Sequence, residues 1–250
     1  MKKINILVAF AVIFMFCMSA CAQKNNQSNP NQGKENPEPS SGRKTYDYTT
    51  IELIDRFHNT LKLGKWDNLF LHNEEEFAPI YIGDIKASIQ LIYKPEKTGN
   101  RIEFENISPL YPTEQSLTLT IDTSRIIGMP MSVWEYYKKT EYRKEFMAFP
   151  VFIENISSDT LIIGEGDMFP ISIEAKDKKG KWCKILNPFE RECGTDLKVI
   201  FLAPHQLAIT AIPICEGTFR TEIRLVFRLS DNRYVYSNVI EGKIEEKMCK

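Results

Sequence analysis

Cysteine is the residue type with the clearest chemical potential in this 250-residue chain. Thiols can pair as disulfides, hold zinc or act as nucleophiles, depending on their spacing and surroundings. Two of the six cysteines lie near the N-terminus, and the other four lie in the second half of the chain: Cys183, Cys193, Cys215 and Cys249. They show no C-x-x-C or C-x-H spacing, which disfavours a zinc site. Four cysteines allow three complete disulfide pairings, and the sequence does not choose among them. One or two disulfides are expected if the chain is exported, and free buried thiols are the alternative.

Residues that commonly build a catalytic or metal site do not occur here in a known arrangement. The three histidines, His58, His72 and His205, are not at metal-ligand spacing from one another. The chain contains no G-x-S-x-G, H-E-x-x-H, P-loop or G-x-G-x-x-G motif. We therefore expect no metal, no cofactor and no catalytic activity. One alternative stays open, because a hydrolase site assembled from dispersed carboxylates needs no local motif.

A run of aromatic side chains is the main candidate for a binding surface. Its members are Trp134, Tyr136, Tyr137 and Tyr142. Where exposed, rings of this kind stack on sugar rings or anchor a partner protein, so the run is the candidate surface for an envelope protein or a glycan. The favoured interpretation is that the rings pack inward and cover one end of the fold. Trp182, directly before Cys183, is expected in the core.

The N-terminus has the layout of a secretion signal. Lys2 and Lys3 precede an apolar stretch over residues 4–18, and small residues follow. The stretch Met18-Ser19-Ala20-Cys21 resembles the lipobox of bacterial lipoproteins. This resemblance implies a signal peptide over residues 1–20 and a lipid on the Cys21 thiol. Lipid chains on that cysteine would tie the protein to a membrane. In double-membrane bacteria, Ala22 after the cysteine implies passage to the outer membrane, on a face that stays undecided.

Residues 21–45 form the lipidated cysteine and a predicted disordered linker. The linker after Cys21 consists of Asn, Gln, Ser, Pro, Gly and charged residues, with no aromatic side chain. Such a composition cannot bury enough apolar surface to offset its loss of conformational entropy. As a flexible coil, the segment would span roughly 25–30 Å. It is the kind of spacer that holds a folded part near a membrane.

The charge balance excludes one class of partner. The formal net charge is −1, and removing residues 1–20 takes away two of the 32 basic residues and none of the 33 acidic ones. The mature chain then has 30 basic and 33 acidic side chains, a net charge of −3. This balance gives no electrostatic footprint for nucleic acid. No second apolar stretch of about 18 residues occurs, so the lipid would be the only membrane attachment.

The second half of the chain shows the period-two alternation of half-buried strands. In 222–229, for example, Ile223, Leu225, Phe227 and Leu229 fall on one face. Turn residues separate the expected strands, as at Asp177-Lys178-Lys179-Gly180. Many short strands at this spacing predict a mainly β fold, with an antiparallel immunoglobulin-like β-sandwich over 113–246. A barrel is the alternative.

Residues 46–112 predict a small α+β region. Thr49 and Glu52 fit a helix capping box, and Ile51, Ile54, Phe57 and Leu61 recur at helical spacing. Strands are expected over 79–82, 86–93 and 101–106. Two interpretations stay open: a separate small domain, or extra elements packed on the sandwich.

From residue 147 onward, the order of features resembles β-sandwich domains of uncharacterised bacterial envelope lipoproteins. The stretch Phe152-Ile153-Glu154-Asn155, the DKKG turn and the closing run Tyr236–Gly242 carry the resemblance. The chain is also distantly similar to BsuPI-type proteinase inhibitors, which are immunoglobulin-like. Together these features predict a non-catalytic binding or structural module of the cell envelope. The alternatives are the hydrolase named above and an inhibitor-like module that presents a loop to a protease.

Overall fold

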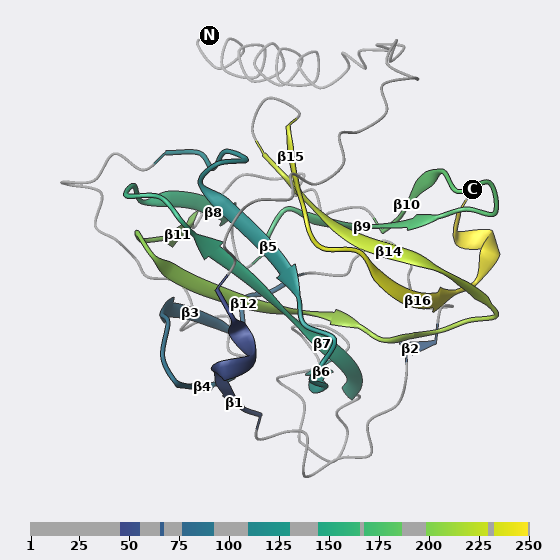
Figure 1. Ribbon diagram of the computed structural model, residues 1–250, viewed down its shortest axis with the longest axis horizontal. Helices are drawn as coiled ribbons and strands as arrows, with labels where there is room; N and C mark the ends of the chain where they lie inside the picture. Colours follow the sequence, from purple (N-terminus) through teal and green to yellow (C-terminus); the bar gives the residue numbers. More distant parts are fainter. Residues whose placement is uncertain are drawn as a thin grey trace, which may run out of the picture. The chain divides into compact units, whose positions relative to one another are not determined.

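Antiparallel strands dominate the computed structural model of the chain (Figure 1). The residues that the structure describes are 46–55, 66–67, 77–92, 110–130, 145–165, 168–186, 199–229 and 233–249. The two largest sheets pack face to face as a β-sandwich, which confirms the predicted mainly β class. The immunoglobulin-like strand topology stays a prediction.

The first large sheet has the strand order β10-β9-β14-β15, with β16 also paired to β14. Its strands are β9 (Ile171–Lys176), β10 (Trp182–Leu186), β14 (Phe219–Arg228), β15 (Tyr234–Tyr236) and β16 (Ile240–Ile244). All of its pairs are antiparallel. The predicted turn after β9 is confirmed, since Gly180 has φ +75° and its N–H donates to the Asp177 carbonyl.

The second large sheet has the order β3-β12-β7-β5, with β6 also paired to β7. Its strands are β3 (Tyr81–Asp84), β5 (Leu117–Ile121), β6 (Ile127–Pro130), β7 (Glu145–Asn155) and β12 (Gln206–Pro213). Smaller pairs join β1 (Glu52–Ile54) to β4 (Ser88–Gln90), β8 (Leu161–Glu165) to β11 (Val199–Leu202), and β13 (Cys215–Glu216) to β2 (Trp66–Asp67).

The main core lies between the two large sheets. One side comes from alternate residues of β9 and β14, with Ile173 opposite Leu225 in register. The other side includes Val151 and Ile153 of β7, both fully buried. The predicted alternation in 222–229 is therefore confirmed, because Ile223, Leu225 and Phe227 share the core face. The polar residues between them must point to the outer face of the sheet.

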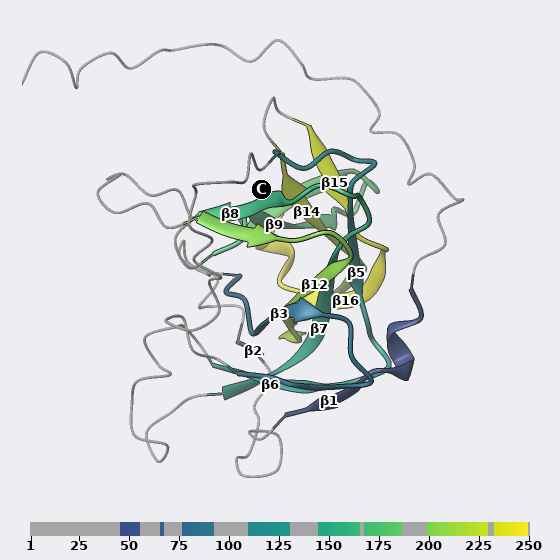
Figure 2. The ribbon, with the colours of Figure 1, turned by 90° about the vertical axis from the view of Figure 1, so that its left-hand side faces the viewer.

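A second core covers the opposite face of β7. Phe152 contributes to it from β7, and Tyr48, Ile51 and Ile89 contribute from the N-terminal region. Figure 2 shows β1 and β6 beyond β7 and β12, on the side away from β9 and β14. Tyr48, Ile51 and Ile89 therefore pack on the face of β7 that points away from the main core. Whether residues 46–112 form a separate small domain stays open.

The helix predicted to begin at Thr49 is wrong for the residues described there. Tyr48–Thr50 form one 3-10 turn, Ile51 is extended with φ −84° and ψ 122°, and Glu52–Ile54 are strand β1. Asp47, not Thr49, caps the turn through a bond from the Thr49 N–H to its side chain. Pairing of β1 with β4 and burial of Ile51 outweigh the helical spacing, because tertiary contacts override weak local propensity. Phe57 and Leu61 lie outside the described residues.

Arg125 clamps this N-terminal segment to the sandwich. Its guanidinium donates to the carbonyls of Tyr48, at 2.9 Å, and Ile51, while its Nε donates to Asp122 at 2.6 Å. Its guanidinium also lies over the Phe152 ring, on which Tyr48 stacks with centroids 4.4 Å apart. The first residues that the structure describes, from 46 onward, are therefore held by side-chain contacts as well as by strand pairing.

Asp122 makes the clamp sensitive to pH. Burial alone would raise the pKa of Asp122, but hydrogen bonds from Ser124 and Arg125 outweigh it and hold the pKa below its usual range. A carboxyl with a lowered folded-state pKa stabilises the fold above its unfolded pKa. This contribution is lost as the pH falls through the folded pKa.

We expect Arg125→Ala to lower the free energy of unfolding by about 2 kcal/mol, because two backbone carbonyls and the Asp122 carboxylate lose a charged donor. Amide hydrogen exchange should speed up mainly in residues 46–55. Lys86→Ala is the control, since Lys86 is an exposed cation of the same region. Unchanged exchange in 46–55 would show that strand pairing alone holds the segment.

Candidate functional site

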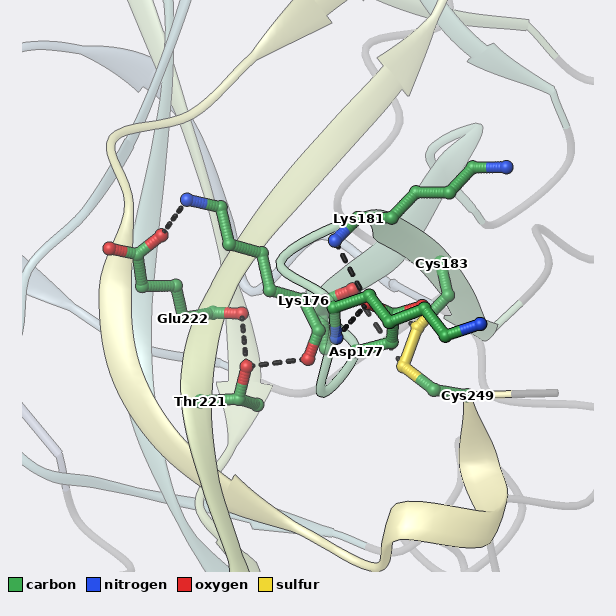
Figure 3. Close-up of a disulfide and its surroundings, with 9 residues drawn as sticks. Lys176, Asp177, Lys181, Cys183, Thr221, Glu222 and Cys249 are labelled. Carbon is green, nitrogen blue, oxygen red and sulfur yellow. Dashed lines mark hydrogen bonds and ion pairs between the residues drawn. A yellow bond between two sulfur atoms is a disulfide. The ribbon is translucent and has the colours of Figure 1, made fainter. Parts of the chain in front are cut away.

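The structure joins Cys183 to Cys249 in a disulfide (Figure 3). Their Cα atoms lie 5.5 Å apart, and the two residues are 66 positions apart in sequence. Cys183 is on β10, opposite Ala175 on the core side of the sheet, and Cys249 follows the 3-10 turn Glu246–Met248. The bridge therefore fastens the segment after β16 to the edge strand of the first sheet. Cys193, one of the remaining candidates, lies outside the described residues.

The outer face of the same sheet carries an aromatic–arginine ladder, defined here as Trp182, Arg224, Tyr236 and Glu174. The Arg224 guanidinium carbon lies 4.1 Å from the ring centroids of both Trp182 and Tyr236. Trp182 is on β10 and Tyr236 on β15, and β14 runs between these strands. The two rings therefore reach Arg224 from opposite sides. The attraction between a guanidinium and an aromatic ring is stronger when both are shielded from water, and it stabilises the buried Arg224 charge.

Glu174 completes the ladder from β9. One of its carboxylate oxygens accepts hydrogen bonds from Arg224 Nε at 2.9 Å and Nη2 at 2.7 Å. The side chains of Arg224 and Glu174 are 5% and 16% exposed, so this ion pair is nearly buried although it faces outward. A buried charge needs such a partner, because leaving water is costly for an unpaired ion.

A second ion pair lies next to the ladder. Lys176 forms an ion pair with Glu222 on β14, and its Nζ lies 5.3 Å from the Trp182 ring centroid. Burial raises the pKa of Tyr236, and the Arg224 charge opposes that shift. The Tyr236 hydroxyl thus stays protonated and neutral at physiological pH. The ladder thus combines two aromatic rings with a paired, nearly buried arginine and glutamate.

The core position predicted for Trp182 is wrong. Its ring is half-buried on the outer face, opposite Lys176 in the strand register. Successive side chains of a strand point to opposite faces of the sheet. Cys183 points to the core to reach Cys249, so its neighbour Trp182 must point away. The alternation in 222–229 predicted that Arg224 lies on the polar face of its strand. No local sequence pattern indicated its contact with Glu174, which lies 50 residues earlier.

Most of the other predicted site residues lie outside the described part of the chain. This applies to Cys21, His58 and His72, and to the aromatic run of Trp134, Tyr136, Tyr137 and Tyr142. His205 is exposed in the turn before β12, with φ 59°. Among the residues that the structure describes, no group of three or more His, Cys, Asp or Glu side chains could hold a metal ion. No helix in the described ranges is long and apolar enough to span a membrane.

Comparisons with known proteins add little to this geometry. No family model matches the chain, and no curated protein matches it. Among solved structures, the chain is similar to the X-ray structure of a Northeast Structural Genomics Consortium target, at 10% sequence identity and a TM-score of 0.30. The match covers 52% of this chain and 88% of that one.

Proposed function

We propose that this chain is a membrane-tethered lipoprotein of the cell envelope, and that its β-sandwich acts as a non-catalytic binding or structural module. The disulfide between Cys183 and Cys249 is the observation that carries the proposal. Disulfides persist in oxidising compartments outside the cytosol and are rare inside it. The bridge therefore agrees with the export predicted from the N-terminal segment.

The tether rests on Cys21. Its position after an apolar stretch and two small residues supports lipid attachment, and the polar residues that follow it supply a spacer. Ala22 supports passage to the outer membrane. The ladder supports the binding part of the proposal, because its rings and paired charges form a fixed polar and aromatic surface on the outer face of the first sheet.

We expect Cys21→Ala to move the protein from the membrane fraction to the soluble fraction and to abolish its labelling by radioactive palmitate. The lipid-accepting thiol is lost while the folded part is unchanged. Cys17→Ala is the matched control, because Cys17 lies within the expected signal peptide and should leave both readouts unchanged. A Cys21→Ala protein that remains in washed membranes would contradict the tether.

Crosslinking in intact cells with the lipidated protein tests the binding role. Recovery of the same envelope protein or glycan in repeated experiments would support it. Failure to recover any reproducible partner would contradict the binding role and leave the structural one.

A further inference from the structure

The hairpin of β9 and β10 carries several lysines that are not part of the ladder. Residues 176–184, called the basic hairpin here, hold five lysines and one acid: Lys176, Lys178, Lys179, Lys181, Lys184 and Asp177. The mature chain as a whole is acidic, with 30 basic and 33 acidic side chains. The basic hairpin is therefore a local reversal of the protein's charge.

Hydrogen bonds within the turn hold the tip of the basic hairpin. The Asp177 carboxylate accepts hydrogen bonds from the backbone N–H groups of Lys179, at 2.8 Å, and Lys181, at 2.9 Å. Its negative charge is thus directed into the turn. Behind the tip, the disulfide fastens Cys183 to the segment after β16 (Figure 3). The lysines are therefore presented from a fixed backbone and not from a loop that must first become ordered.

Two lysines of the basic hairpin pair with acidic side chains of the described residues, and three do not. Lys176 pairs with Glu222, and Lys178 pairs with Glu246 at 2.6 Å. Lys179, Lys181 and Lys184 are exposed and form no ion pair with any residue in the described ranges. Figure 3 shows the Lys181 side chain extending away from the disulfide. Three solvent-facing ammonium groups thus lie on one projecting hairpin.

We infer that the basic hairpin docks on the phosphate-bearing headgroups of a membrane surface. The inference rests on the proposed membrane tether, which would keep the sandwich close to such a surface and raise its effective concentration there. Lysine ammonium groups are compact point charges, which suits a laterally mobile layer of phosphates better than one shaped pocket. Each lysine near an anionic bilayer strengthens binding about fivefold.

Vesicle sedimentation tests the inference on the mature chain with Cys21→Ala, which lacks the lipid. Vesicles rich in phosphatidylglycerol should bind this protein, and vesicles of phosphatidylcholine alone should not. The double variant Lys179→Gln/Lys181→Gln should bind the anionic vesicles about 30-fold more weakly at low salt. The matched control, Lys86→Gln/Lys243→Gln, removes the same charge from exposed positions outside the basic hairpin and should bind almost as well as the unsubstituted chain. Salt above about 0.5 M should abolish binding by screening.

Three outcomes would overturn the inference. These are no binding to anionic vesicles, equal binding to neutral ones, and an equal loss in the control variant. Each is distinguishable from failure of the proposed tether, because the fractionation of Cys21→Ala measures lipid attachment and the vesicle assay uses a protein that has no lipid. Circular dichroism of both double variants verifies that the folds are intact.

Discussion

Replacing Cys183 and Cys249 together with serine should lower the free energy of unfolding by about 4 kcal/mol. The disulfide closes a loop with a sequence separation of 66, and cross-linking such a loop removes conformational entropy from the unfolded chain. The loop runs from β10 through β16, so the bridge restrains much of the first sheet. Urea denaturation of the oxidised protein and the variant measures the difference.

Reduction provides the control for this prediction. The unsubstituted protein treated with a thiol reductant should unfold at the same urea concentration as the double variant, because both lack the bridge. The variant is expected to keep its native fold at low urea. Cys183 and Cys249 are only partly buried where they pack against the main core, so serine at these positions leaves the fully buried residues unchanged. An unchanged midpoint after substitution would show that the bridge adds nothing to stability.

Arg224→Ala should lower the free energy of unfolding by about 3 kcal/mol. The substitution leaves the Glu174 carboxylate nearly buried without its partner, and it also removes two cation–π contacts. Equilibrium denaturation measures the effect. A double-mutant cycle with Glu174→Gln separates the ion pair from the ring contacts, because Glu174→Gln removes only the carboxylate charge.

Arg220→Ala is the matched control for Arg224→Ala. Arg220 lies on the same strand and also pairs with a glutamate, Glu241, but these side chains are 72% and 71% exposed. Exposed pairs contribute little because water and salt screen them. The control should therefore unfold as the unsubstituted protein does. Equal losses from the two arginines would contradict the importance assigned to burial of the ladder.

Local patterns predicted the strands well because each strand's alternation reflects a single requirement, burial of one face. This holds for 222–229 and for the turn at Asp177–Gly180. The same reasoning failed at Thr49, where a capping pattern and helical spacing are present in the sequence but no helix forms in the described residues. There the segment buries Ile51 and pairs β1 with β4, and both contacts involve residues far away in sequence.

The candidate site was less predictable than the strands for the same reason. The ladder assembles residues from β9, β10, β14 and β15, and its central ion pair spans 50 positions. The choice among cysteine pairings also depends on which strands meet. Alternation along a strand carries one further signal: Trp182 and Cys183 are neighbours on β10, so they lie on opposite faces and cannot both be in the core.

The pairing of Cys183 with Cys249 also affects how the protein matures. Synthesis proceeds from the N-terminus, so Cys193 and Cys215 emerge before Cys249 does. The thiol of Cys183 therefore meets two non-native partners before its native one. Rapid oxidation in order of appearance would trap the wrong bridge, and thiol–disulfide exchange would have to correct it. The yield of native protein should thus depend more on a disulfide isomerase than on the strength of the oxidant.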